Sequence, residues 1–147
     1  MSPEPILAPQ SVRLGLPPTS KEDAIRLCGQ ILVDAGAAAP AYIDGMLARE
    51  QQISTFLGEG VAIPHGTNES REHIVRAALG FVQFPGGIDW GSGKTAYVLI
   101  PIASATDEHV SILAALAEVL MDSDSAERLR TTSSVDEVLT LLAPSED

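Results

Sequence analysis

Two apolar, β-rich runs near the middle of the chain place the strongest constraint on its fold. Residues 74–84 form the longer run, which ends at Pro85-Gly86-Gly87, and residues 97–102 are continuously apolar. A strand without polar alternation is typical of a position that is covered on both faces of a sheet. Pro101 indicates that pairing in the second run ends near that residue. The sheet therefore needs other elements on both of its faces.

Helical periodicity precedes these runs. Thr19 and Glu22 have capping-box spacing, which predicts a helix that begins at Thr19 and carries an apolar stripe. Gly36 favours the end of this helix, because glycine readily adopts the left-handed conformation of a C-terminal cap. Pro40 then opens a second helix at the first-turn position that proline prefers. Shorter strands are expected at residues 53–56 and 61–64.

Helical periodicity returns after the two runs. A third helix is predicted from Thr106 and a fourth over residues 124–130. Ser134 and Glu137 form a second capping box that leads into a last helix. Helices at both ends with strands between them indicate the α/β class, with a mixed β-sheet flanked by helices in a single-domain sandwich.

The length of the chain sets its domain organisation. A chain of 147 residues suits one domain, so we expect a single domain over residues 1–147. Residues 1–18 hold five of the ten prolines, which predicts a loosely structured N-terminal arm with one short extended piece at 11–14. The glycine-rich residues 89–94 lack the full spacing of a phosphate-binding loop, and we interpret them as a turn between strands.

Charge and cysteine content exclude several classes of function. The 20 acidic residues outnumber the 9 basic ones, and the net charge of −11 disfavours nucleic acid and anionic membranes as partners. Cys28 is the single cysteine, so no internal disulfide can form. No apolar run reaches the roughly 18 residues that a membrane span needs, and the N-terminus lacks the pattern of a secretory signal. We therefore expect a cytoplasmic protein without direct membrane insertion.

His65 has the most unusual setting of the three histidines. It follows an apolar strand stopped by Pro64 and precedes Gly66. Proline has no N–H for the strand ladder, so the chain must leave the sheet there. Glycine permits close approach of the backbone, so we expect exposed amide donors beside a stiffly presented imidazole. That geometry suits a nucleophile that accepts an anionic group, although the local pattern also fits an ordinary turn.

The other two histidines have weaker signals. His109 lies in the first turn of the predicted third helix, where unpaired N–H groups and the helix dipole stabilise an anion. A surface histidine without a role fits the same pattern. His73 lies in a polar stretch and is expected to have no role. The spacing of the three histidines matches no zinc-binding pattern, so neither a metal nor another cofactor is predicted.

Two histidines at strand ends and an arginine suggest phosphoryl transfer through histidine. A neutral imidazole is a good nucleophile towards phosphorus, and the remaining task is to stabilise charge on the phosphoryl oxygens. Arg49 can do so, because a guanidinium is always charged and binds phosphate oxygens in a fork. Its position in the last turn of a helix has a simpler explanation, since a cation is favoured there by the helix dipole.

Four segments resemble the mannitol/fructose family of enzyme IIA proteins of the bacterial phosphoenolpyruvate-dependent sugar phosphotransferase system. They are Met46-Leu47-Ala48-Arg49-Glu50, the sequence GEGVAIPHGT over residues 58–67, Asp107-Glu108-His109-Val110 and the sequence SVDEVL over residues 134–139. The likeness covers residues 21–142, and within the family it is greatest to mannitol-specific members that occur as free-standing chains. The resemblance implies a mixed β-sheet flanked by helices, in agreement with the periodicity.

The resemblance also implies roles and partners. His65 is the residue expected to be phosphorylated, and His109 and Arg49 match the second histidine and the arginine that assist it. The implied donor is the phosphorylated histidine-containing phosphocarrier protein, and the implied acceptor is a cysteine of the IIB domain of a mannitol permease. The family's pattern implies no metal or organic cofactor.

Three alternatives to mannitol phosphotransfer stay open at this point. A fructose-specific enzyme IIA has the same chemistry with another permease. A nitrogen-related enzyme IIA has the same fold and histidine, but regulates other proteins by phosphorylation-dependent binding. A metal-dependent hydrolase that uses His65 and His109 is the third alternative, and no spacing in the sequence supports it.

Overall fold

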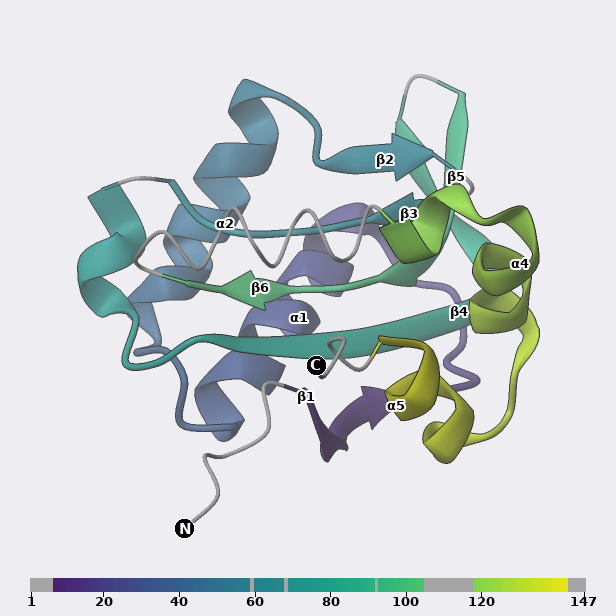
Figure 1. The fold of residues 1–147 in the computed structure, drawn as a ribbon. Coiled ribbons are helices and arrows are strands. Elements are labelled where there is room, and N and C mark those ends of the chain that lie inside the picture. Colours follow the sequence, from purple (N-terminus) through teal and green to yellow (C-terminus); the bar gives the residue numbers. More distant parts are fainter. Residues whose placement is uncertain (1–6, 59, 68, 92, 105–117, 143–147) are drawn as a thin grey trace, which may run out of the picture.

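The computed structural model describes residues 7–58, 60–67, 69–91, 93–104 and 118–142. Within these residues the strands form one mixed six-stranded sheet, in which β1, β4, β5, β3 and β2 are neighbours in that order and β6 also pairs with β4 (Figure 1). The strands are β1 (Leu7–Arg13), β2 (Phe56–Gly58), β3 (Val61–Ala62), β4 (Ala78–Gly91), β5 (Lys94–Leu99) and β6 (Ile102–Ala103).

Helices cover both faces of this sheet. The first face carries α1 (Lys21–Asp34) and α2 (Ala41–Gln52), and the second carries α4 (Ser123–Thr131) and α5 (Val135–Leu142) (Figure 1). A short 3₁₀ helix, η1 (Glu69–His73), follows β3. The predicted fold class, a mixed sheet flanked by helices, is confirmed. Within the described residues, no helix is both long and apolar enough to cross a membrane.

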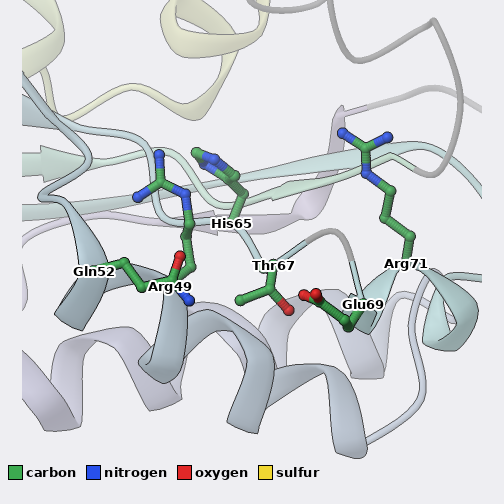
Figure 2. A pocket seen from close by; sticks show the side chains of 7 residues that line it. Arg49, Gln52, His65, Thr67, Glu69 and Arg71 are labelled. Atoms are coloured by element: carbon green, nitrogen blue, oxygen red, sulfur yellow. The ribbon is translucent and has the colours of Figure 1, made fainter.

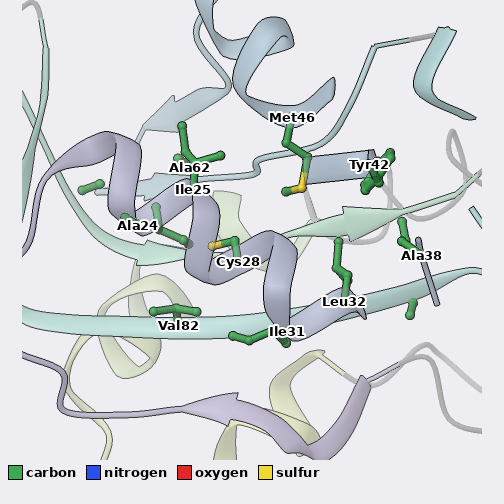
Figure 3. Packing of buried hydrophobic residues seen from close by; sticks show 14 of the residues in the cluster. Ala24, Ile25, Cys28, Ile31, Leu32, Ala38, Tyr42, Met46, Ala62 and Val82 are labelled. Carbon is green, nitrogen blue, oxygen red and sulfur yellow. The ribbon is translucent and has the colours of Figure 1, made fainter. Parts of the chain in front are cut away.

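The continuous apolar character of the central strands follows from this layering. Val82 of β4 and Leu99 of β5 belong to the core beneath α1 and α2, while Phe81 and Val98 belong to the core beneath α4 and α5. Successive side chains of a strand point to opposite faces, so both sets must be apolar when both faces are covered. Figure 3 shows the first core, in which the apolar stripe of α1 lies against β4. Cys28 is buried in that stripe.

The helix boundaries follow the expected caps closely. Ser20, one residue after the predicted Thr19, is the N-cap of α1, and its hydroxyl accepts a hydrogen bond from the Asp23 N–H at 3.1 Å. Gly36 has a φ of 76° just beyond the end of α1, as a left-handed cap requires. The Ser134 hydroxyl accepts from the Glu137 N–H at 3.2 Å, which confirms one half of the second predicted capping box, whereas the Ser134 N–H donates to the Thr132 hydroxyl at 3.0 Å.

The strand boundaries depart from the expectation in β4. The strand begins at Ala78 rather than residue 74, and it continues past Pro85-Gly86-Gly87 to Gly91. The register with β5 shifts between Gln83 and Ile88, so these residues form a bulge instead of an end. A partner strand that pairs on both sides of a bulge keeps the ladder continuous. Gly91 pairs with Lys94, so residues 89–94 do form a turn between strands, as predicted.

Within the arm predicted over residues 1–18, the structure has a longer strand than the short extended piece expected at 11–14. Leu7–Arg13 is a strand that pairs in parallel with β4 at one edge of the sheet, and its register shifts between Leu7 and Val12. Pro9 lies inside that irregular stretch. An edge strand needs hydrogen bonds on one side only, so it tolerates a proline that would exclude a central strand. Tertiary pairing with β4 orders residues that have no strong periodicity of their own.

The third predicted helix lies largely outside the described residues. Residues 118–121 are helical and correspond to its predicted end. His109, which the prediction places in its first turn, also lies outside the described residues.

Candidate active site

The loop after β3 carries His65 and contacts β6, α2 and η1. The ladder between β3 and the segment after β5 continues, because the Ile100 N–H donates to the Ala62 carbonyl and the Ile102 N–H donates to the Pro64 carbonyl, each at 2.9 Å. Proline cannot donate, but its carbonyl still accepts. The residue before His65 is therefore tied to β6.

Tyr42 of α2 fixes the residue after His65. Its buried hydroxyl donates to the Ile102 carbonyl and accepts from the Gly66 N–H, both at 2.9 Å. The Gly66 N–H is therefore not one of the exposed amide donors that were expected beside His65, because it binds the tyrosine hydroxyl. A buried hydroxyl with both hydrogen bonds satisfied holds its partners in place. His65 thus sits on a loop that is pinned on both sides.

Glycine is required here for close packing. A Cβ on Gly66 would collide with the Ser70 hydroxyl and the Tyr42 ring, and a Cβ on Gly45 of α2 would collide with Ser70. Both glycines let α2, the His65 loop and η1 approach one another within van der Waals contact. The three elements consequently converge on one small region.

This convergence creates a cavity of about 390 Å³ beside His65 (Figure 2). Arg49 and Gln52 reach it from the end of α2, and Glu69 and Arg71 reach it from η1. The remaining lining residues are His65, Gly66 and Thr67 of the loop. The lining is strongly polar and contains two guanidinium groups, in a chain whose net charge is −11. The cavity therefore suits a small anion more than an apolar ligand.

Helix geometry explains why Arg49 reaches the cavity. Gly45, Arg49 and Gln52 are spaced by four and three residues, so they share one face of α2. Gly45 on this face packs against η1, and Arg49 and Gln52 continue the same face toward His65. The Arg49 guanidinium also donates a hydrogen bond to the Ile53 carbonyl just beyond the helix end. The structure therefore brings His65 and Arg49, two of the predicted site residues, together.

The hydrogen bonding of His65 defines the state of its ring. Nδ1 lies 2.8 Å from the Ile63 carbonyl oxygen. A carbonyl oxygen can only accept, so Nδ1 carries the hydrogen and Nε2 carries the lone pair in the neutral ring. The half-buried ring thus has its nucleophilic nitrogen on the edge away from Ile63.

Several effects set the pKa of His65. Burial of the ring lowers the pKa below the ordinary value of 6.5, and the hydrogen bond to Ile63 opposes this shift. The positive charges of Arg49 and Arg71 lower the pKa further, while the Glu50 carboxylate raises it. The net result is a lowered pKa, so the imidazole is neutral at pH 7 and able to act as a nucleophile.

Arg71 is the site residue that sequence reasoning missed. It lies six residues after His65 in the polar stretch that was interpreted as having no role. The available signal was an arginine a few residues after the histidine loop. The sequence did not show the 3₁₀ turn of η1, and this turn directs the Arg71 side chain to the cavity. His73 of the same stretch does not line the cavity, and its Nε2 lies 3.7 Å from a Glu72 carboxylate oxygen.

Metal ligation finds no support in the described part of the chain. No group of three or more histidine, cysteine, aspartate or glutamate side chains there is arranged to hold a metal ion. His109 cannot be placed relative to the cavity, because it lies outside the described residues. The arrangement that the structure does show is a neutral imidazole beside two guanidinium groups.

Comparison with known proteins places the chain in a family. Residues 5–144 match the family model described as phosphoenolpyruvate-dependent sugar phosphotransferase system, EIIA 2. The chain is 46% identical over 136 residues to a multiphosphoryl transfer protein of Salmonella typhimurium, a match that covers 92% of this chain and 36% of that protein. The chain thus spans about a third of the length of that relative.

A shorter relative and a solved structure match along nearly their whole lengths. The mannitol-specific phosphotransferase enzyme IIA component of Bacillus subtilis is 36% identical over 136 residues, covering 92% of this chain and 95% of that protein. The solution structure of Escherichia coli enzyme IIA mannitol, in complex with phosphorylated enzyme IIB mannitol, has a TM-score of 0.86 and 39% identity, covering 91% of this chain and 94% of that one. With its fold and its family match in agreement, the chain belongs to the EIIA 2 family of the phosphoenolpyruvate-dependent sugar phosphotransferase system.

Proposed function

We propose that this chain is a phosphocarrier that accepts a phosphoryl group on His65 and passes it to a IIB domain. One observation carries the proposal: a neutral imidazole, with Nδ1 bound to the Ile63 carbonyl, lies in a polar cavity beside two arginines. Membership of the EIIA 2 family supports the phosphotransferase role. The alternative in which His65 occupies an ordinary turn does not account for the cavity or for the two guanidinium groups.

The transfer exchanges one nitrogen–phosphorus bond for another. The lone pair on Nε2 of His65 attacks phosphorus in line, while the bond from phosphorus to the donor imidazole breaks and its electron pair returns to that ring. The two bonds have similar energy, so the step is reversible and positioning does most of the work. Nδ1 keeps its hydrogen, which stays hydrogen-bonded to the Ile63 carbonyl, so the phosphorylated ring carries a positive charge. The proposal therefore assigns the phosphoryl group to Nε2.

Arg49 stabilises the phosphoryl oxygens in this proposal. Its guanidinium lines the same cavity as His65 and is charged at every accessible pH. His109 stays a prediction from the sequence and the family resemblance, as a second histidine that assists the group. Its test is separate: His109→Ala is expected to leave folding intact and to slow transfer.

The proposed partners are the phosphorylated histidine-containing phosphocarrier protein as donor and the IIB domain of a mannitol permease as acceptor, with a cysteine as the accepting residue. The solved complex of enzyme IIA mannitol with phosphorylated enzyme IIB mannitol supports the acceptor. The net charge of −11 favours basic partner surfaces, since opposite fields accelerate encounter. We place the protein in the cytoplasm, where both proposed partners present their reactive groups.

Mannitol is the proposed sugar. The relative that the chain matches end to end is named for mannitol. The multiphosphoryl transfer protein, to which the chain is more identical, has a name that states no sugar. The permease test below therefore decides between mannitol and fructose.

The decisive test is labelling by the donor. The purified chain is mixed with the phosphorylated phosphocarrier protein and analysed by intact-mass spectrometry at neutral pH, because phosphohistidine is labile in acid. Wild type and the control His73→Ala are expected to gain one phosphoryl group, and His65→Ala none. A His65→Ala protein that still gains a phosphoryl group on histidine contradicts the assignment.

A second stage tests the acceptor. The labelled chain is mixed with membranes that contain a mannitol permease or a fructose permease, and the formation of each sugar phosphate is followed. Mannitol phosphate is the expected product. Formation of fructose phosphate alone reassigns the sugar, and formation of neither product by a labelled chain favours a regulatory role.

A further inference from the structure

The cavity beside His65 contains a second guanidinium whose task the proposed function leaves open. Arg71 comes from η1, on the side of the cavity opposite the α2 residues Arg49 and Gln52. Figure 2 shows the imidazole of His65 between the two arginine side chains. The two guanidinium groups therefore line the cavity on different sides of this ring.

The base of Arg71 is held rigidly. The preceding residue, Ser70, is buried, and its hydroxyl donates to the Thr67 carbonyl at 2.7 Å. The Ser70 N–H lies 3.2 Å from the Thr67 hydroxyl, which accepts from it. The Ile74 N–H donates to the Arg71 carbonyl at 3.0 Å and closes the turn. The Arg71 backbone is thus fixed to the same loop that carries His65.

The charge of Arg71 is not neutralised by an ion pair within the described part of the chain. No carboxylate there lies within 4.0 Å of its guanidinium, whereas Arg26 has the Glu22 carboxylate at 2.7 Å and Arg128 has Glu137 at 3.8 Å. Glu69 is the acidic residue that lines the cavity, and its side chain is exposed to solvent. An unneutralised cation beside a nucleophile is suited to an anionic ligand.

One guanidinium fork binds two of the three oxygens of a phosphoryl group. A phosphoryl group carries roughly −1.5 to −2 charges at pH 7. Arg49 alone supplies one positive charge, and its guanidinium also donates to the Ile53 carbonyl. When Nε2 is phosphorylated and Nδ1 keeps its hydrogen bond to the Ile63 carbonyl, the ring itself carries one positive charge. A second guanidinium supplies hydrogen-bond donors for the oxygen that the Arg49 fork does not bind.

We propose that Arg71 binds the phosphoryl oxygens of phosphorylated His65 from the side opposite Arg49, so that two guanidinium groups hold the transferred group between them. This inference rests on the proposed function, because it concerns the phosphorylated state of the same histidine. Arg71 already acts on the unmodified ring, since its charge contributes to the lowered pKa of His65. A phosphoryl group on Nε2 extends into the cavity and brings negative charge nearer to Arg71 than the ring itself.

The test uses phosphoramidate, which phosphorylates histidine without a partner protein. Its nitrogen–phosphorus bond breaks, a bond from phosphorus to Nε2 forms, and ammonia leaves. The ³¹P resonance that is missing in His65→Ala identifies phosphorylated His65. Its chemical shift is then followed against pH in wild type, Arg71→Gln, Arg71→Lys and Arg26→Gln. Arg26→Gln is the matched control, because it removes the same charge from the exposed surface of α1.

Loss of a guanidinium that contacts the phosphoryl group raises the pKa of its second ionisation. We expect Arg71→Gln to raise this pKa by on the order of one unit, Arg71→Lys to raise it less, and Arg26→Gln to match wild type. Arg49→Gln, as a positive control, is expected to raise it as well. A titration of Arg71→Gln that matches wild type, while Arg49→Gln is shifted, overturns the proposal.

Kinetics separates this proposal from the proposed function. With the phosphorylated phosphocarrier protein as donor, Arg71→Gln is expected to accept the phosphoryl group more slowly than wild type by on the order of tenfold or more. Unchanged rates together with an unchanged titration remove Arg71 from the site and leave the role of His65 intact. A wild-type chain that no donor labels contradicts the proposed function, and the phosphoramidate titration still decides whether Arg71 binds the group.

Discussion

Two neighbouring residues at the end of α2 enter opposite kinds of environment. Arg49 lines the cavity beside His65, whereas Glu50 is buried on the other side of the helix. Neighbours in an α-helix point about 100° apart, so adjacent residues can serve different regions. Tyr42 and Met46 continue the buried face of Glu50 by steps of four residues. The last turn of α2 therefore contributes Arg49 to the polar cavity and Glu50 to a buried polar cluster.

The buried region, here called the Glu50 cluster, consists of Lys21, Glu50, Thr55 and Trp90. The Glu50 carboxylate accepts from the Thr55 hydroxyl at 2.6 Å and from the Trp90 indole N–H at 3.1 Å. The Lys21 ammonium lies 3.1 Å from the same carboxylate and 5.0 Å from the centre of the Trp90 ring. These contacts join the start of α1, the end of α2, the residue before β2 and the strand β4.

The fold keeps the group that holds α2 in place apart from the groups that line the cavity. Burial alone raises the pKa of Glu50, but hydrogen bonds from Thr55, Ser54 and Lys21 outweigh it and lower the pKa. The carboxylate is therefore charged and saturated with donors, and it locks α2 in place. The cavity holds charges that still have capacity for an anion. A satisfied buried charge positions a helix, whereas the guanidinium groups beside His65 are available for the anionic group that we propose.

Removal of Glu50 is expected to have the largest effect on stability. Glu50→Ala leaves the buried donors of Thr55 and Trp90 without an acceptor, so we expect a loss of about 3–5 kcal/mol in the free energy of unfolding. Urea denaturation followed by circular dichroism measures it. Glu50→Gln keeps an acceptor and should lose less. A Glu50→Ala protein as stable as wild type refutes the structural role of the cluster.

Arg49→Gln is expected to show the opposite pattern. The side chain serves the cavity, so the free energy of unfolding should change by no more than about 0.5 kcal/mol. Loss of a charged hydrogen bond to the phosphoryl group slows acceptance by on the order of tenfold to a hundredfold. Urea denaturation and rapid-quench labelling measure the two quantities on one protein sample. If Arg49→Gln also lowers the free energy of unfolding substantially, the proposed distinction between the two faces of α2 is wrong.

Lys21→Met tests how much of the cluster depends on its most exposed member. The Lys21 side chain is 33% exposed, against 5% for Glu50. An ion pair that reaches solvent contributes little, so we expect a loss of about 1 kcal/mol or less in the free energy of unfolding. The rate of labelling should match wild type. A loss as large as that of Glu50→Ala assigns the cluster's stability to the ion pair instead of the hydrogen bonds.

The smallest expected effect is the pH dependence of the free energy of unfolding, in which His65 and Glu50 act over different pH ranges. The folded-state pKa of His65 lies below 6.5 and that of Glu50 lies below 4.5. In both cases the unfolded chain binds the proton more readily, so stability is present at higher pH and is lost as pH falls. His65 acts first, as pH falls from 6.5 through its lowered pKa, and Glu50 acts below 4.5.

Labelling follows the first of these windows, because only the neutral imidazole attacks phosphorus. Acceptance should be constant above pH 6.5 and fall below it. Arg49→Gln removes a cause of the lowered pKa and should move the fall to higher pH. The His65 Cε1 proton, followed by NMR, reports the same titration. An Arg49→Gln variant with an unshifted titration shows that the guanidinium does not act on the ring.

Local patterns in the sequence were sufficient for the caps and for the histidine loop. Gly36 and Ser134 act through contacts within a few residues, and Pro64 has no N–H of its own to donate, although its carbonyl accepts from the Ile102 N–H. Arg49 was identified as a site residue from its type and its resemblance to a known motif. The layer order followed from continuous apolar strands, which need cover on both faces. These features depend on chemistry that a short window of sequence contains.

Long-range contacts decided the rest. Glu50 meets Trp90 across 40 positions, β1 is a strand because β4 accepts it at the edge, and Arg71 enters the site because Ser70 packs against α2. Local residue spacing does not predict such contacts, because each one forms between elements that are far apart in the sequence. Local sequence patterns identified the groups that can do chemistry and most of the helices and strands, but not the full extent of β1 and β4. Only the tertiary structure decided which charges are buried and saturated and which face the cavity, because desolvation and partner geometry exist only after packing.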